Sequence, residues 1–334
     1  MLITELIECI EKNVDPAMAA DWDQSGIQVA GSKDRIHRLA LTLDPRPESI
    51  RKALDWNADF VLSHHPLTLS PRLPKDRDEL HKVYALLFQS GVGLYAAHTS
   101  LDVHIQGPAG WLARALRCTH IRPVHPIQPP ARIWIALERS LVPPAAWDEI
   151  VNHPICLQWT ISDTDCHLLV AESQVDTLLR QVSATTNLDR VRMSKTLPVR
   201  TQHGYGIMGQ LPEPMTWSAL SSVLSSHLSS SAWTLTGSPP DRIHTVAYCP
   251  GSGMELAVKA FAQGADIYIS GDLKYHQAQE IEAWGLTLDV GHFSLEEKMM
   301  STWAHALGED LAQQEVEVTF IPGHNPLRTQ ACPH

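Results

Sequence analysis

Histidine and carboxylate side chains directly follow three short apolar segments of this sequence. In chain order they are His64, His65, His98, Asp102, His292 and Glu296. Imidazole and carboxylate groups together favour Zn, Mn, Fe or Co over Ca or Mg. Five or six such groups exceed the three or four protein ligands that one catalytic zinc takes. They therefore predict two divalent metal ions per chain, roughly 3.5–4 Å apart, with a bridging hydroxide that attacks an electrophilic carbon or phosphorus.

Each of these residues also has a simpler interpretation when it is taken alone. The His64-His65 pair before Pro66 is commonly just the polar end of a strand. The two pairs spaced four residues apart, one beginning at His98 and the other at His292, serve equally well as capping or hydrogen-bonding pairs. Their recurrence after predicted strands favours a joint metal site. The chain has 18 histidines, and we expect most of the others to be solvated.

A second group of candidates lies in the last third of the chain. Gly251, Ser252 and Gly253 join a predicted strand to a helix, where backbone N–H groups can hold an anion. A simple tight turn explains the same residues equally well, because the segment lacks the lysine of a P-loop and the full dinucleotide spacing. We interpret His276 as a candidate acid/base group or substrate contact. For His276, a surface histidine at a helix start is the alternative.

The elements that must position these residues alternate between strands and helices. Leu39–Leu43 and Asp59–Ser63 are predicted strands, and residues 47–57 between them have the apolar spacing of a helix. This order indicates a βαβ unit in a largely parallel sheet. Ligands of such sheets gather beyond the carboxyl ends of the strands. We therefore expect the metal candidates to converge there.

Two parts of the chain repeat a common pattern. At an offset of 207, residues 58–63 match residues 265–270, and at an offset of 194, residues 98–102 match residues 292–296. Two matches in the same order, each at a strand, favour duplicated halves. We predict an α/β (α+β) core of two similar halves around mixed, partly parallel sheets.

A stretch of different character separates the two halves. The proline-rich segment 125–130 and residues 198–206 are predicted to connect this stretch to the core. Between them we predict three strands and two helices. The expected organisation is an inserted α+β module at residues 129–203, which is within the usual domain range. Residues 1–128 and 204–334 then form a discontinuous core.

The composition argues against several classes of protein. The chain has 26 basic and 37 acidic residues and a formal net charge of −11, whereas broad nucleic-acid or anionic-membrane binding needs a basic surface. No window approaches 18 apolar residues, so no membrane span is predicted. No signal peptide is recognisable, and the six cysteines form no CxxC pair. We expect a cytoplasmic protein with reduced thiols that acts on a small molecule.

The candidate residues lie in segments that resemble the Nif-three-like family, whose members are also described as GTP cyclohydrolase I type 2 homologues or dinuclear metal centre hexameric proteins. The matching segments are Trp22–Val29, Ser63–Leu67, Ala97–Asp102, Pro250–Gly253, Gly264–Asp272, Tyr275–His276 and Gly291–Glu296. They cover both halves of the predicted core in order. One departure is Asp23-Gln24, where the family usually has Asp-Asn.

The resemblance implies a two-metal site. Its ligands would be His64, His65, Asp102, His292 and Glu296. Asp102 or Glu296 would bridge or flank the metal pair, and His98 would lie outside the ligand set in a supporting or proton-transfer position. The resemblance also implies a toroidal homohexamer with the sites facing an interior cavity. Longer members of the family carry an inserted module similar to the PII or CutA proteins at the position of residues 129–203.

Three classes of function fit these residues. The first is a metal-dependent hydrolase of a nucleotide-like or cyclic-amide small molecule, in which a metal-bound hydroxide attacks and His98 or His276 moves a proton. The second is a non-catalytic metal-handling or regulatory scaffold protein. The third is a metabolite-binding module that senses through its insert. The cyclohydrolase label fits the first class, because ring opening of guanine begins with hydration of a ring carbon, but a metal site does not fix a substrate.

Overall fold

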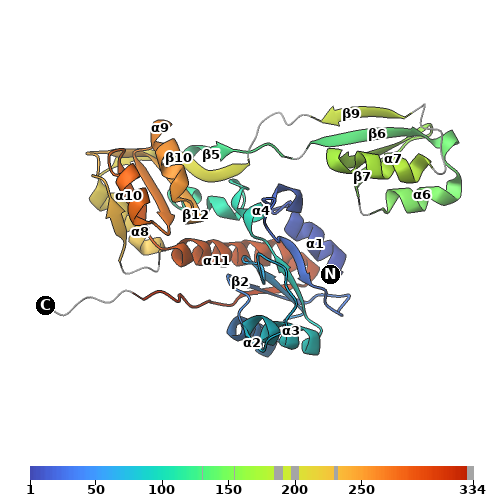
Figure 1. The fold of residues 1–334 in the computed structure, drawn as a ribbon, viewed down its shortest axis with the longest axis horizontal. Helices are drawn as coiled ribbons and strands as arrows, with labels where there is room; N and C mark the ends of the chain where they lie inside the picture. The colour runs from blue at the N-terminus through green and yellow to red at the C-terminus, as the bar shows by residue number, and fades with distance from the viewer. Residues whose placement is uncertain (130, 154, 184–190, 197–202, 229–231, 329–334) are drawn as a thin grey trace. The chain divides into compact units, whose positions relative to one another are not determined.

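The computed structural model describes the chain except for residues 130, 154, 184–190, 197–202, 229–231 and 329–334. The chain divides into two compact units (Figure 1). One comprises Met1–Ile127 together with Gln202–His334, and the other is Gln128–Thr201. The larger unit is discontinuous in sequence, and the smaller one is inserted into it. Among the described helices, none combines the length and the apolar character that crossing a membrane requires.

The first half of the larger unit is built on a five-stranded sheet with the order β1-β4-β3-β2-β15. Its strands are β1 (Gly26–Val29), β2 (Arg38–Thr42), β3 (Phe60–Ser63), β4 (Gly93–Ala96) and β15 (Glu317–Phe320). Strands β2, β3, β4 and β15 run parallel, and β1 pairs antiparallel with β4. Its helices are α1 (Ile3–Glu11), α2 (Pro47–Asp55), α3 (Glu79–Ser90), the short α4 (Thr99–Asp102) and α5 (Trp111–Ala115).

The second half is built on a six-stranded sheet with the order β11-β14-β13-β12-β10-β5. Its strands are β5 (Thr119–Pro126), β10 (Gly204–Met215), β11 (Thr234–Thr236), β12 (Ile243–Ser252), β13 (Ile267–Gly271) and β14 (Leu286–Asp289). Strands β12, β13 and β14 run parallel, and the other neighbours pair antiparallel. Its helices are α8 (Trp217–His227), α9 (Ala257–Ala262), α10 (Tyr275–Ile281) and α11 (His292–Leu311).

The two sheets share one arrangement, which confirms the predicted duplicated core. Strands β1, β4, β3 and β2 correspond in order and direction to β11, β14, β13 and β12. One hydrogen-bonded turn also recurs. Asp59 Oδ2 accepts from the backbone N–H groups of residues 37–38 at 2.8 and 3.0 Å. At the offset of 207, Asp266 Oδ2 accepts from the N–H groups of residues 244–245, both at 2.8 Å.

The strand register corrects one detail of the predicted duplication. Ser63 pairs with Ala96 in the first half, and Ser270 pairs with Asp289 in the second. The last parallel strands are therefore related by an offset of 193, whereas the histidine motifs that follow them are related by 194. The second half has one additional residue between β14 and His292. Gly291 there has a φ of 89°, in the left-handed region that glycine adopts without strain.

The long helix α11 contacts strands of both sheets, and it lies between them in Figure 1. Its buried residues Leu295, Met299, Trp303 and Leu307 recur at four-residue spacing, as expected for the apolar stripe of a helix. They belong to one hydrophobic cluster that includes residues of both sheets. Packing in this cluster fixes the first turns of α11 relative to the two sheets.

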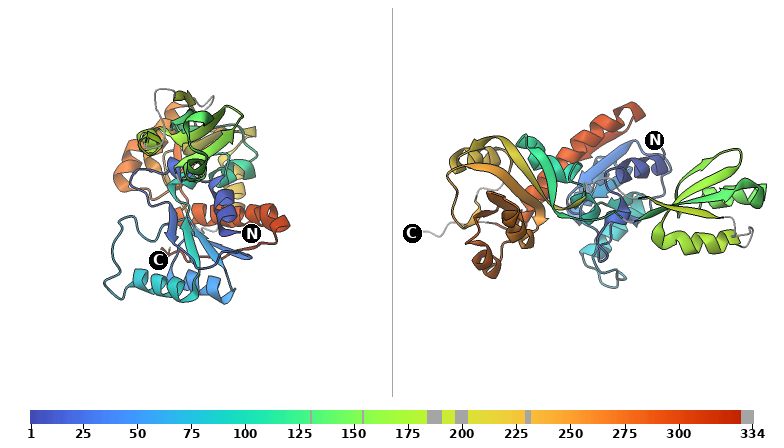
Figure 2. Two further views of the ribbon diagram at one scale, coloured as in Figure 1. Left: turned by 90° about the vertical axis from the view of Figure 1, so that its right-hand side faces the viewer. Right: turned by 90° about the horizontal axis from the view of Figure 1, so that it is seen from above.

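The inserted unit has a four-stranded antiparallel sheet with the order β7-β8-β6-β9. Its elements are β6 (Arg132–Glu138), α6 (Pro144–Val151), β7 (Cys156–Ile161), β8 (Asp165–Ala171), α7 (Val175–Ser183) and β9 (Arg192–Thr196). This βαββαβ order and strand arrangement are ferredoxin-like (Figure 2). Strand β9 was not predicted from the sequence. Its residues Arg-Met-Ser-Lys-Thr are mostly exposed and lack the apolar alternation of a half-buried strand.

The connections between the units differ from the prediction. Strand β5 extends to Pro126, so His125 and Pro126 belong to a sheet rather than to a linker. Proline is compatible with this position because β5 is an edge strand. At the return, β10 begins at Gly204, so residues 204–206 also form strand. Residues 198–202 of the predicted return connection lie outside the described residues.

We expect Asp59→Ala and Asp266→Ala each to lower the free energy of unfolding by about 1–3 kcal/mol, because two backbone N–H groups lose their acceptor. The loss should be larger for Asp59, which also accepts from Lys33 Nζ at 2.7 Å. Urea denaturation measures both changes, with the exposed Asp241→Ala as a matched control. Equal stability of all three variants would contradict a structural role for the repeated turn.

Candidate metal centre

The structure brings six sequence candidates together at the carboxyl ends of parallel strands. They are His64 and His65 after β3, His98 and Asp102 in the segment after β4, and His292 and Glu296 in the first turns of α11 after β14. Strand β3 ends at Ser63, so the two adjacent histidines are not held on opposite faces of a sheet. Their ring centroids lie 5.0 Å apart. Both halves of the core therefore contribute to one cluster.

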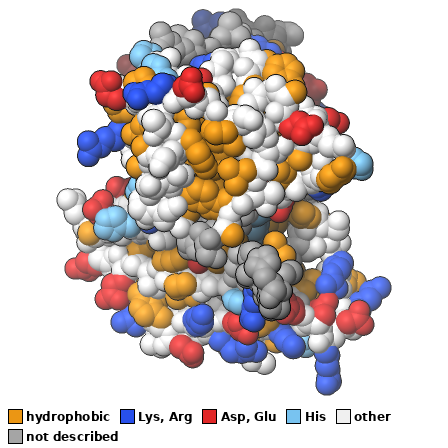
Figure 3. Space-filling view, turned by 90° about the vertical axis from the view of Figure 1, so that its left-hand side faces the viewer, with side chains coloured by type: hydrophobic (Ala, Val, Ile, Leu, Met, Phe, Trp, Pro, Cys, Tyr) orange, Lys and Arg blue, Asp and Glu red, His pale blue; other side chains and the backbone are white. Residues whose placement is uncertain are grey.

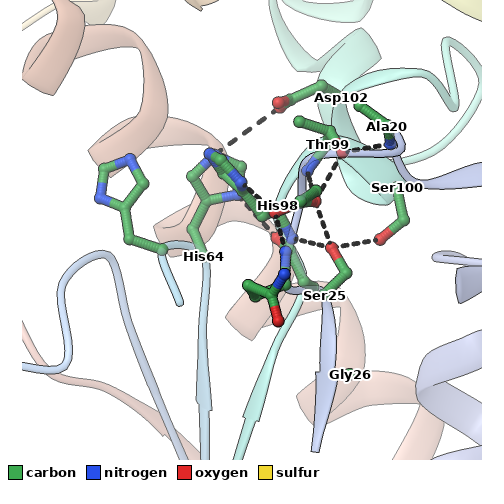
Figure 4. Close-up of polar contacts among 12 residues, drawn as sticks. Ala20, Ser25, Gly26, His64, His98, Thr99, Ser100 and Asp102 are labelled. Atoms are coloured by element: carbon green, nitrogen blue, oxygen red, sulfur yellow. Dashed lines mark hydrogen bonds and ion pairs between the residues drawn. The ribbon is translucent and has the colours of Figure 1, made fainter. Parts of the chain in front are cut away.

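Glu296 lies at the centre of the cluster, with a side chain that is 4% exposed. Its Oε1 lies 3.4 Å from His64 Nε2. Its Oε2 lies 3.2 Å from His65 Nε2 and 2.8 Å from His292 Nε2. Asp102 Oδ1 lies 3.7 Å from the same nitrogen of His64 (Figure 4). One buried carboxylate thus faces three imidazoles, and a second carboxylate adjoins one of them.

A hydrogen bond through Nδ1 orients each histidine ring and leaves its Nε2 for the cluster. The acceptors are the carbonyl oxygen of Ala97 for His64 (2.7 Å), Asp44 Oδ1 for His65 (2.7 Å), Asp23 Oδ1 for His98 (2.7 Å) and Asp272 Oδ2 for His292 (2.8 Å). Because a carbonyl or carboxylate oxygen accepts, Nδ1 carries the proton in each pair. A partner of this kind on the far nitrogen is the usual support of a histidine metal ligand.

His98 faces the cluster from the N-terminal end of α4. Its ring centroid lies 5.3 Å from that of His64 and 5.6 Å from that of His65. Ligand atoms of these three histidines lie within 4.8 Å of one another. Ligand atoms of His65, His292 and Glu296 also lie within 4.8 Å of one another. His65 belongs to both groups, so the two possible sets of metal ligands share one histidine.

Asp23 holds His98 through a network of short hydrogen bonds. Besides the His98 ring, its carboxylate accepts from Thr99 Oγ1 at 2.5 Å, Thr99 N at 3.0 Å and Ser25 Oγ at 2.7 Å. Burial alone would raise the pKa of Asp23, but the hydrogen bonds from His98, Thr99 and Ser25 hold it well below the ordinary value. Asp23 therefore stays ionised and fixes the orientation of the His98 ring.

Several buried ligand atoms of the cluster have no hydrogen-bond partner among the described residues. They are His64 Nε2, Asp102 Oδ1, His292 Nε2 and Glu296 Oε2. His292 and Glu296 are close together but are not aligned for a hydrogen bond. Each such group costs about 1–3 kcal/mol when it is buried unpaired, and more when it is charged. Divalent cations would satisfy all four atoms, and imidazole nitrogen with carboxylate oxygen suits Zn, Mn, Fe or Co.

In the metal-free protein, opposite charges stabilise the cluster. Burial alone would lower the histidine pKa values, but neighbouring carboxylates raise the pKa of His65 to about 10 and that of His292 to about 9. Burial alone would raise the pKa of Glu296, but the adjacent histidines hold it well below its usual range. Burial raises the pKa of Asp102. Protons therefore occupy positions for which a metal ion would compete.

Two glycines allow β12 and β13 to approach the cluster. A Cβ atom on Gly251 would lie 2.0 Å from Glu296 Oε1 and 3.3 Å from His292 Nε2. A Cβ atom on Gly271 would lie 2.4 Å from the backbone nitrogen of His292. Side chains at either position would therefore displace the start of α11 or the carboxylate that it carries.

The predicted anion loop has a different conformation from the one expected. Gly251 and Ser252 belong to strand β12, and only Gly253 precedes a helical turn. The adjacent cavity is lined by Glu255 and Asp272 as well as Lys274, and this charge balance does not favour an anion. An anion-binding role for Gly251, Ser252 and Gly253 stays a prediction.

His276 is not brought to the cluster. It lies exposed on α10, where its Nδ1 is 3.2 Å from Gln279 Oε1. Its ring contacts that of Tyr275, with centroids 5.4 Å apart. A catalytic role for His276 stays a prediction.

The aspartates that orient the rings were not predicted from the sequence. Asp272 occupies the position equivalent to His65 at the offset of 207, so the repeat itself contained a signal. Asp44 ends the predicted strand that precedes α2. Asp23 lies in a segment that resembles the family, but its separation of 75 positions from His98 hides their contact from any local pattern.

Three comparisons show which known proteins this chain resembles. The sequence profile of Duf34/NIF3 (NGG1p interacting factor 3) matches residues 1–326. The GTP cyclohydrolase 1 type 2 homolog of Staphylococcus epidermidis is 22% identical, over 88% of this chain and 90% of its own length. That of Listeria monocytogenes is 23% identical over 95% of each chain. The crystal structure of a Bacillus cereus protein related to NIF3 has a similar fold, with a TM-score of 0.71, 20% identity and coverage of 100% and 99%.

We expect Gly251→Ala to weaken metal binding, because its Cβ would overlap the Glu296 carboxylate. Gly264→Ala is the matched control: its φ is also positive, at 93° against 64° for Gly251, but its Cβ would meet nothing within 4 Å. Metal content and thermal unfolding of both variants separate the two effects. Gly264→Ala should lower the thermal stability but keep the full metal content. Equal metal content in both variants would contradict the close approach at Gly251.

Proposed function

Because the chain belongs to the Duf34/NIF3 family, we propose that it holds two divalent metal ions and uses them to hydrolyse a small molecule. The proposed ligands are His64, His65, Asp102, His292 and Glu296. The observation that supports this proposal best is the set of buried nitrogen and oxygen atoms in the cluster for which the described part of the chain provides no hydrogen-bond partner. Such groups are rare in folded proteins unless an ion or a ligand satisfies them.

Divalent ions at this position would supply Lewis acidity and make hydroxide available at neutral pH. The donor set accepts Zn, Mn, Fe or Co, and we propose no single native metal. Glu296 would be a ligand of these ions, and its two oxygens face different histidines. Asp102 adjoins His64 on the side of α4.

His98 is the proposed proton-transfer residue. Its Nε2 faces the cluster, while the ionised Asp23 holds its Nδ1 at 2.7 Å. This pairing fixes the tautomer and the orientation of the ring, as a general acid/base requires. The side chain is 14% exposed, so a bound substrate can reach it.

The proposed substrate class is a nucleotide-like or cyclic-amide molecule. The matched relatives are named as GTP cyclohydrolase 1 type 2 homologs, and hydrolytic opening of a ring is chemistry that two such ions support. The alternative is a metal-handling or regulatory scaffold protein without turnover. Such a protein would use the same ligands but would release its ions readily.

We further propose a cytoplasmic homohexamer, as the family resemblance implies, with an insert of PII or CutA type. The second half exposes the large apolar residues Leu235, Tyr275 and Trp284, and Figure 3 shows hydrophobic side chains gathered on one face of that half. Apolar patches of this kind favour association. The molar mass of the assembly in solution and the location of the protein in fractionated cells test these two points.

Metal analysis of the natively purified protein is the first test, and we expect about two ions per chain. His64→Ala should remove at least one, because Nε2 of this ring lies between both carboxylates of the cluster. His305→Ala, an 81% exposed histidine on α11, is the control and should keep the full content. Less than one ion per chain, together with unchanged content in His64→Ala, would contradict the site. Absence of turnover in a nucleotide and cyclic-amide screen with restored metal would favour the scaffold alternative.

Asp23→Asn should lower kcat about 100-fold or more without changing metal content, because it disturbs the orientation and tautomer of the proton-transfer histidine. Asp21→Asn, an exposed aspartate two residues away, is the matched control. Steady-state kinetics and metal analysis on the same preparations give both readouts. A fall in metal content parallel to activity would show that Asp23 supports the ligands rather than proton transfer.

A further inference from the structure

A cavity of about 250 Å³ opens beside the metal cluster. Its lining includes His65 and His292 of the cluster together with apolar side chains. The apolar contributors are Leu43, Phe293, Pro326 and Leu327. A molecule in this cavity would therefore contact two proposed ligands as well as hydrocarbon.

The C-terminal segment that lines the cavity is held to the core by hydrogen bonds from two of its backbone N–H groups, and a third such group bonds within the segment. Ile321 N donates to the carbonyl oxygen of Leu41 at 2.7 Å, and Gly323 N donates to Glu297 Oε1 at 2.8 Å. Leu327 N donates to Asn325 Oδ1 at 3.0 Å. Pro326 and Leu327 are thus placed as a wall of the cavity, although the side chain of Leu327 remains 76% exposed.

The charges around the cavity are unfavourable for phosphate. Among the described residues that line it, Asp44 and Asp272 are carboxylates, and none is a lysine or an arginine. Together with Asp23, Asp102 and Glu296, these residues place five carboxylates in and around the cluster. The positive charge of two divalent ions would be largely offset by these carboxylates. The approach of a triphosphate, which carries several negative charges, is therefore disfavoured.

The volume limits the occupant further. Pockets for drug-sized ligands usually span roughly 300–1,000 Å³, so a cavity of about 250 Å³ accommodates a single ring system rather than a whole nucleotide. Apolar walls favour the faces of a flat ring, and the carboxylates at its edge accept hydrogen bonds from N–H groups. These properties describe a heterocyclic amide or amine.

We propose that this cavity binds the uncharged ring of the substrate, and that the substrate carries no phosphate. This inference rests on the proposed hydrolase function, which it narrows from nucleotide-like molecules to neutral cyclic amides and nucleosides. The C-terminal residues Pro326 and Leu327 are then specificity-determining residues, although they lie more than 20 positions beyond the last proposed ligand in the sequence.

The first test compares guanosine with GTP by calorimetric titration into the zinc-loaded protein, with inorganic tripolyphosphate as a probe for phosphate binding to the ions. We expect guanosine to bind at least tenfold more tightly than GTP and to keep its affinity when tripolyphosphate is present. Tighter binding of GTP, or displacement of guanosine by tripolyphosphate, would overturn the inference. This comparison measures binding and does not depend on turnover. A failed hydrolysis screen would therefore refute the proposed hydrolase, whereas the relative affinities of guanosine and GTP would still test whether the cavity binds an uncharged ring.

The second test changes the apolar wall. Leu327→Ala should weaken guanosine binding about 3- to 10-fold at unchanged zinc content, because the bound ring would cover apolar surface of a side chain that is exposed in the free protein. Leu73→Ala is the matched control, since Leu73 is 74% exposed against 76% for Leu327 and does not line the cavity. Leu327→Arg should shift the preference toward GTP. Unchanged affinities in both Leu327 variants would overturn the assignment of this wall.

Discussion

The burial of the Glu296 carboxylate among three imidazoles is the interaction on which the core depends. A carboxylate that is 4% exposed is strongly unfavourable in a protein interior unless positive charge compensates it. In the metal-free chain, protonated His65 and His292 supply that charge, and their raised pKa values express the same interaction. Either protons or metal ions must therefore occupy the cluster. The fold keeps its two halves together around a group that neither half could bury alone.

The duplicated architecture explains how residues that are distant in the chain reach one place. Each half ends its parallel strands at the cluster, and α11 packs against both sheets, so the first turns of this helix have little freedom. The asymmetry between the halves is equally important. At the offset of 207, Gly251 stands where the first half has Asp44, and Asp272 stands where it has His65.

Much of this arrangement could be predicted from the sequence, because strand ends and repeated motifs are local signals. The duplicated halves and the convergence of His64 and His292 followed from such signals. Contacts between distant loops could not be predicted, since no short pattern relates Asp23 to His98. Strand β9 was missed for another reason: its exposed residues lack the alternation that identifies a half-buried strand.

The differences between the two halves show why a duplicated fold forms one site instead of two. A second Asp-His pair at the position of Gly251 and Asp272 would put an aspartate side chain where Glu296 Oε1 now lies. Because Gly251 has no side chain, the Glu296 carboxylate of α11 can lie beside His64 and His65 of the first half. Asp272, in turn, accepts the Nδ1 proton of His292 and so supports a ligand rather than acting as one. The first half provides the adjacent histidines His64 and His65. The second half provides the central carboxylate of Glu296 and, through Gly251, the space that this carboxylate occupies.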